Sequence, residues 1–288
     1  MSESYLQTRT LTDALDRLDT VFAGRGTRLT GREKRRKVAS CFAPRPASGF
    51  DSWAFSASEY EEMALVISGR APELLDRLVR PRSNRDFTVV GHCSLDLRFD
   101  ADVNGAESVP HTLRDGTFVC GARITSGRAL LYSSGLAGLP TTDGRTVYLY
   151  QPSERAAADA AEIASSTFRN RGEATRKGLA VTFPQARTAH LPDYGWVTRL
   201  TSEDGLYIVT NFVNSGEAIL NESGFFARET HVVQMLCLCS TQQRHNVIID
   251  GPFVAFYADD AGVHAAAWFD RDSFERSAKR RRTDWGVM

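Results

Sequence analysis

The spacing of apolar residues changes near residue 86, and this change limits the folds open to the 288-residue chain. Before it, apolar residues recur at intervals of four, three and four, at Leu11, Leu15, Leu18 and Phe22. That spacing predicts a helix ending at Gly24. After it, apolar residues occupy every second position, at Cys93, Leu95, Leu97 and Phe99. This alternation predicts a strand with one buried face.

Further elements follow the same order, with helices first and strands afterwards. Capping and proline signals predict helices over 58–69, 71–80 and 153–170. Strand-like runs cover 117–124, 128–134, 145–151, 178–183, 206–213, 230–239, 246–257 and 263–269. Without regular βα alternation, a doubly wound sheet and a (β/α)₈ barrel are excluded. We expect one α+β domain over 1–288, mainly helical over 1–85 and mainly antiparallel β over 86–288.

Composition narrows the possible partners. The 35 basic residues balance the 35 acidic ones, so no net field attracts nucleic acid or an anionic membrane. No apolar run approaches the length of a membrane span, and the first residues lack a signal-peptide pattern. Five cysteines, an odd number, suit reduced thiols and predict a cytoplasmic protein. The preference for Arg over Lys suggests a bacterial source.

Three features toward the C-terminus resemble the serpins. Residues 216–226, GEAILNESGFF, are similar to the strand and hinge that lead into the serpin reactive loop. Residues 250–270 are similar to the closing strands, and the interval from Glu222 to Phe253 matches the loop and the strand after it. Residues 177–200 and 145–164 resemble the strands and helices upstream. The resemblance covers roughly residues 115 to 270 and implies helices packed on large, mostly antiparallel sheets.

The same resemblance gives an expectation about mechanism. Inhibitory serpins insert their cleaved loop as a new strand, which requires small residues after the hinge. Here Phe225 and Phe226 follow the hinge, and a charged pair comes next. We expect these rings to be unable to enter the sheet, so that the protein stays in a single arrangement and traps no protease. The chain is also shorter than a typical serpin.

Candidate site residues fall into two groups. His92, Asp96 and Arg98 share one strand face and are candidates for acid/base catalysis, together with His231. A solvated sheet face explains the same pattern without chemistry. Tyr194, Trp196 and Arg199, with Glu222, are candidates for ligand binding. In a serpin-like fold, Tyr194 and Trp196 are instead expected to pack beneath the sheet.

Other chemistry has little support in the sequence. Cys237 and Cys239 lack a second cysteine pair, so we expect core thiols and no metal site. No phosphate-binding loop, dinucleotide motif, nucleophile elbow or HExxH motif occurs, and we expect no cofactor. The basic stretch 25–37 is either a patch for phosphate or RNA or a solvated loop and helix face.

Two functions remain open. The first is a cytoplasmic, non-inhibitory serpin-like protein that binds a peptide, a protein or a small ligand against its sheet or in a cleft beside it. The second is an enzyme of bacterial small-molecule or peptide natural-product biosynthesis that uses acid/base residues. An enzyme requires a cavity with convergent polar groups, whereas a binding protein presents an open apolar patch or strand edge.

Overall fold

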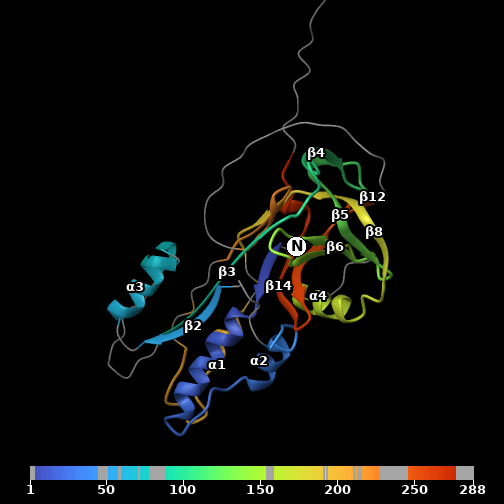
Figure 1. Cartoon of the computed structure of the whole chain (residues 1–288). Coiled ribbons are helices and arrows are strands. Elements are labelled where there is room, and N and C mark those ends of the chain that lie inside the picture. The colour runs from blue at the N-terminus through green and yellow to red at the C-terminus, as the bar shows by residue number, and fades with distance from the viewer. Residues whose placement is uncertain are drawn as a thin grey trace, which may run out of the picture.

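The structure is a computed structural model that contains two sheets (Figure 1). It describes residues 4–44, 51–57, 60–70, 72–77, 88–153, 159–190, 192, 194–209, 212, 216–227 and 246–276. Within these residues, strands are more numerous than helices, and all strand pairs except one are antiparallel. The α+β class predicted from the sequence is therefore confirmed.

The larger sheet has nine strands. Its order is β1 (Tyr5–Thr8), β14 (Gly262–Phe269), β13 (Phe253–Asp259), β7 (Thr146–Tyr150), β6 (Ala137–Pro140), β5 (Phe118–Tyr132), β8 (Ala174–Pro184) and β12 (Asn246–Ile248), and β4 (Ala106–Thr112) also pairs with β5. Strands β8 and β12 pair in parallel, the one parallel pair among the described strands. Strand β5 covers two predicted strands in one, because it continues through two register shifts along β8.

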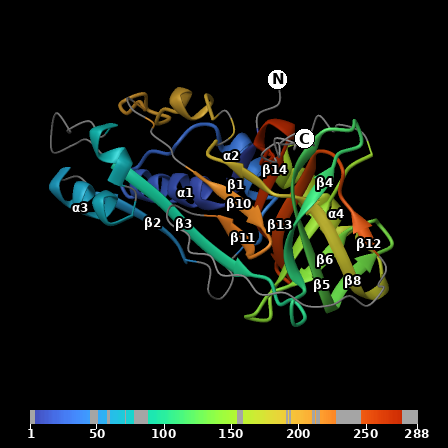
Figure 2. The ribbon, with the colours of Figure 1, turned by 90° about the horizontal axis from the view of Figure 1, so that it is seen from above.

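The smaller sheet has five strands and is antiparallel throughout. Its order is β2 (Asp51–Ala57), β3 (Thr88–Arg98), β11 (Gly224–Ala227), β10 (Ala218–Asn221) and β9 (Ala186–Thr188). Strand β3 extends along β2 at one end and along β11 at the other (Figure 2). Segments distant in sequence therefore form this sheet together.

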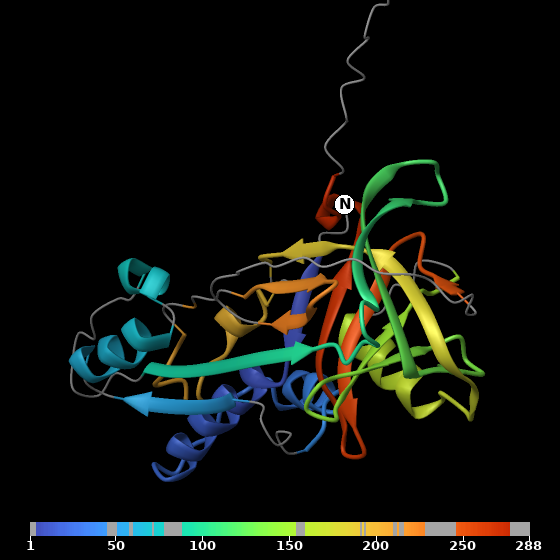
Figure 3. The same cartoon turned by 45° about the horizontal axis from the view of Figure 1, so that its top comes forward.

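The helices of the described residues pack on both sheets (Figure 3). They are α1 (Thr10–Ala23), α2 (Arg32–Ala39), α3 (Tyr60–Arg70) and α4 (Ala160–Arg169), with short 3₁₀ turns η1 (Pro72–Arg77), η2 (Val197–Arg199) and η3 (Arg271–Ser273). Helix α1 packs on β2 and β3, and α4 packs on β13 and β14. Helix α1 and strand β3 approach so closely at Gly91 that an added Cβ there would lie 2.6 Å from the carbonyl oxygen of Thr10.

The main core lies between the two sheets. Leu95, Leu97 and Phe225 from the smaller sheet belong to the same buried cluster as Phe253 and Phe269 from the larger one. The predicted alternation in β3 is confirmed at this cluster, since Leu95 and Leu97 are buried whereas Asp96 and Arg98 are exposed. Burial of this apolar surface is the main stabilising contribution to such a fold.

Several local predictions differ from the structure. The predicted strand over 206–213 is wrong over its described part, where Ile208 makes one isolated bridge to Thr201 and Tyr207 stacks on Phe22. The predicted strand over 230–239, with Cys237 and Cys239, lies outside the described residues.

The N-terminal strand β1 was not predicted, although it pairs with β14 and its Leu6 amide donates to the carbonyl of His190. In the basic stretch, Arg35 is buried and forms ion pairs with Asp16 and Asp19 on α1.

Candidate functional site

Strand β11 places the two adjacent phenylalanines inside the smaller sheet. Phe225 pairs with Leu97 of β3 on one side and with Leu220 of β10 on the other. The expectation that these rings cannot enter the sheet is therefore wrong. The reason is strand alternation, which sends the two rings to opposite faces. Phe225 is 0% exposed in the core, whereas Phe226 is half-buried on the outer face.

The turn before β11 is held by a buried side chain. Gln185 is buried, and its Nε2 lies 2.9 Å from Oε2 of Glu222, 2.9 Å from Oγ of Ser108 and 3.0 Å from the carbonyl of Gly121. At Gly224, two residues after Glu222, an added Cβ would lie 2.1 Å from the carbonyl oxygen of Leu97. Only glycine allows the backbones to approach this closely, so this turn fixes where β11 enters the sheet.

The outer face of the smaller sheet gathers charged and apolar side chains. We call this surface, formed by Asp96, Arg98, Arg187, Ile219, Asn221 and Phe226, the outer sheet face. Four of its members lie directly opposite one another on successive strands: Asp96 on β3, Phe226 on β11, Ile219 on β10 and Arg187 on β9. Directly opposite residues share a face and contact each other. An acid, two apolar residues and a base thus form one row across the strands.

The charges at the two ends of this row are accessible to solvent. The Asp96 side chain is 59% exposed and lies 3.6 Å from Arg98, which is 70% exposed. The Arg187 side chain is 64% exposed and is paired with Glu217, which is only 15% exposed. Exposed ion pairs contribute little to stability, so these groups remain available to a partner.

The predicted acid/base residues lie along β3 and do not converge. His92 is half-buried, and the four-residue interval to Asp96 spans about 13 Å along the strand. Asp96 pairs with Arg98 at the solvated face. His231 lies outside the described residues. In the part of the chain that the structure describes, no three metal-ligating side chains cluster together.

The predicted ligand-binding residues lie in separate surroundings. Tyr194 is buried with α1 side chains and contacts Phe212, and burial raises the pKa of its phenol. Trp196 packs beside the same cluster, whereas Arg199 is exposed. Glu222 binds Gln185 at the entrance to β11. Tyr194 and Trp196 thus pack among apolar side chains at α1, and their role in ligand binding stays a prediction.

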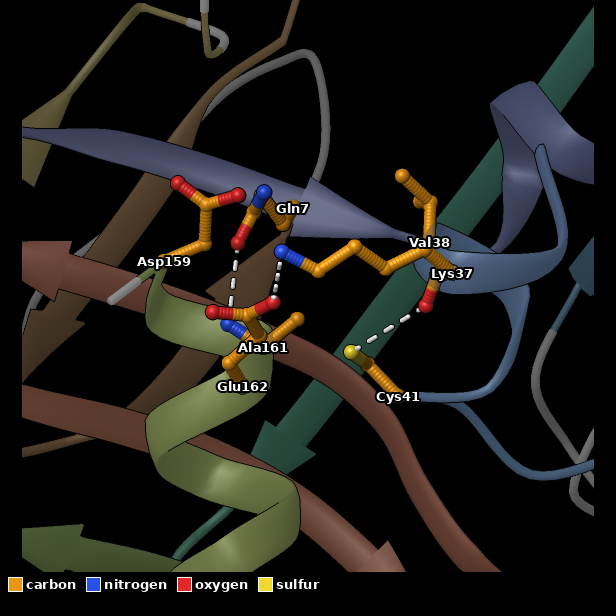
Figure 4. Close-up of a pocket in the computed structure, with 7 residues that line it drawn as sticks. All are labelled: Gln7, Lys37, Val38, Cys41, Asp159, Ala161 and Glu162. Atoms are coloured by element: carbon orange, nitrogen blue, oxygen red, sulfur yellow. Dashed lines mark hydrogen bonds and ion pairs between the residues drawn. The ribbon is translucent and has the colours of Figure 1, made fainter. Parts of the chain in front are cut away.

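A small pocket lies between β1, α2 and α4 (Figure 4). Its lining residues are Gln7, Lys37, Val38, Cys41, Asp159, Ala161 and Glu162, and its volume is about 40 Å³. Nζ of Lys37 lies 2.8 Å from Oε1 of Glu162. Burial, followed by the charges of Glu162 and Asp159, raises the pKa of the Cys41 thiol. The pocket has room for a water molecule or two and is too small for an organic substrate.

The row on the outer sheet face was not identified from the sequence. Strands β9, β10 and β11 have only three or four residues each, too few for a clear alternation. Their register across the sheet depends on contacts between distant segments. The one signal in the sequence was the pair Phe225–Phe226 directly after the hinge.

The two sheets and their order define a serpin-like fold. Solved structures agree with it over almost the whole chain: Serpin48 of the insect Tenebrio molitor is 11% identical, with 93% of this chain and 92% of that chain covered and a TM-score of 0.55. Human thyroxine-binding globulin in complex with thyroxine is 11% identical, with 92% of this chain and 91% of that chain covered and a TM-score of 0.56. The thermophilic serpin Tengpin is 10% identical, with 93% and 89% covered and a TM-score of 0.55. At this identity the likeness concerns the fold alone.

Sequence comparisons add no closer relative. No family model matches the chain, and no curated protein is similar to it in sequence. Among the helices in the described ranges, none is long and apolar enough to cross a membrane.

Proposed function

We propose that this serpin-like protein acts by binding, and that a segment of a protein partner lies against the outer sheet face. The observation that carries the proposal is the pair Ile219–Phe226, two apolar side chains directly opposite each other on adjacent strands and only half-buried. Aromatic side chains in the centre of a contact surface often supply much of the binding energy. The exposed charges of Asp96 and Arg187 surround this pair as a polar rim.

A binding role without protease trapping is consistent with the position of β11. Gly224–Ala227 is already hydrogen-bonded between β3 and β10. The free energy of inserting these four residues is therefore not available to drive a later trapping step. We place this binding in the cytoplasm because the cysteine content suits a reducing compartment.

An enzyme has less support from the geometry. Asp96 and Arg98 on β3 are exposed, His92 is half-buried at a distance from them, and the small pocket at α4 is lined by none of the three. Binding of a small ligand has a precedent on this fold in thyroxine-binding globulin. Here, however, the open apolar pair on a sheet face suits a protein segment better than a compact molecule.

Selection from a random-peptide library tests the proposal. Peptides that bind the wild-type protein are expected to lose about tenfold in affinity for Phe226→Ser. Phe118→Ser is the matched control, because Phe118 is a 69% exposed aromatic on β5 of the other sheet. Equal affinity for both variants would show that the outer sheet face is not the binding site.

Incubation with serine and cysteine proteases tests the absence of trapping. We expect no covalent complex that survives denaturing electrophoresis. Such a complex with any protease of the panel would contradict a non-inhibitory role.

A further inference from the structure

We infer that the outer sheet face recognises an amphipathic helix of its partner, lying across the strands, with a basic residue near Asp96 and an acidic residue near Arg187. This inference rests on the proposed function and specifies the partner. The chemistry follows from the row Asp96, Phe226, Ile219 and Arg187, whose members occupy four adjacent strands in register.

The direction of the row favours a helix over an extended peptide. Three steps between neighbouring strands separate Asp96 from Arg187, a distance of about 15 Å. An α-helix covers this distance in about ten residues. Its side chains at i and i+3 or i+4 lie about 5–6 Å apart, which matches one step from Phe226 to Ile219. An extended chain aligned with the strands would meet only one end of the row.

The charges determine what the helix must carry. The guanidinium of Arg187 is exposed, whereas Glu217, its ion-pair partner, is largely shielded, so the positive group of this pair is the one that faces a partner. At the other end, Asp96 is exposed but Arg98 lies 3.6 Å away and partly neutralises it. Each end is thus partly offset by its own ion-pair partner, and we expect removal of the Arg98 charge to strengthen the acidic end.

Three synthetic helical peptides test this arrangement. They share two central apolar residues and differ only at two end positions, which carry Lys and Glu, Lys and Lys, or Glu and Glu. Identical ends are the right controls because a helix binds in either direction. The Lys/Glu peptide is expected to bind the wild-type protein about three- to fivefold more tightly than the other two at low salt, and the difference should fade at high salt.

Charge reversal should change this ranking in a defined way. Asp96→Lys should bind the Glu/Glu peptide best, and Arg187→Glu should bind the Lys/Lys peptide best. Arg98→Gln should increase the affinity of the Lys/Glu peptide about twofold. If Arg187→Glu lowers the melting temperature because of repulsion by Glu217, Arg187→Gln replaces it and should lose the preference for the Lys/Glu peptide over the Lys/Lys peptide.

Failure of this inference differs from failure of the proposed function. If library peptides bind through Phe226 but the three helical peptides keep one ranking on every variant, or do not bind at all, the helical partner is refuted and the binding face remains. If no selected peptide depends on Phe226, the binding face itself is refuted, and this inference with it.

Discussion

Replacing Phe225 by alanine tests whether β11 belongs to the sheet. The ring is completely buried and packs in the core between the two sheets, between Leu97 and Leu220 on the neighbouring strands. Removing a buried phenylalanine side chain costs about 3–5 kcal/mol, because the apolar contacts are lost and a cavity remains. Phe226→Ala is the matched control, since its ring lies on the outer face and is only half-buried.

The control variant should lose about 1 kcal/mol, corresponding to the smaller area that leaves contact with the protein. In thermal unfolding, the Phe225 variant should therefore melt roughly 8–15 °C below the wild type, and the Phe226 variant only a few degrees below. Urea titration monitored by tryptophan fluorescence gives an independent measure of the same difference. Equal effects of the two substitutions, or a harmless Phe225→Ala, would refute the placement of β11 between β3 and β10.

Two further predictions concern the close approach at Gly224 and the reactivity of the Cys41 thiol. Gly224→Ala should destabilise the protein by about 2 kcal/mol, because the new methyl group meets a carbonyl oxygen of β3. The control Gly69→Ala in α3 should be neutral or slightly stabilising. Similar unfolding curves for the two variants would contradict this prediction. Glu162→Gln removes a charge that raises the pKa of the Cys41 thiol, so the thiolate fraction should rise and alkylation at mildly alkaline pH should become about twofold faster. Peptide-level mass spectrometry should show no change at Cys120, and a parallel change at both thiols would indicate a global effect.

The sequence predicted much of the fold because its signals are local. The helix from Leu11 to Phe22 and the alternation from Cys93 to Phe99 depend on residues close in the chain, and both are present in the structure. The serpin resemblance depended on the region around Glu222, where the structure places the turn before β11. Local period and turn chemistry were therefore enough for the α+β class, and the serpin resemblance supplied the expected architecture.

The outer sheet face was less accessible to sequence reasoning because it depends on register. Whether Phe226 lies beside Asp96 is decided by pairing between segments more than a hundred residues apart. A shift of one residue would exchange Phe225 and Phe226 between core and surface. The sequence does not show that the two rings face opposite sides, so from the sequence alone the aromatic pair is expected to be a steric obstacle.

The pairing of β1 with β14 has a consequence for how the protein reaches its native state. The backbone amide of Asp270 donates a hydrogen bond to Oγ of Ser4, a residue 266 positions earlier in the chain. Strand β1 lies at the edge of the nine-stranded sheet. During synthesis, the first strand must wait until nearly the whole described chain has left the ribosome before it finds its neighbour. Such distant pairing makes assembly slow, and a chaperone that shields the waiting strand would shorten the period in which it is open to aggregation.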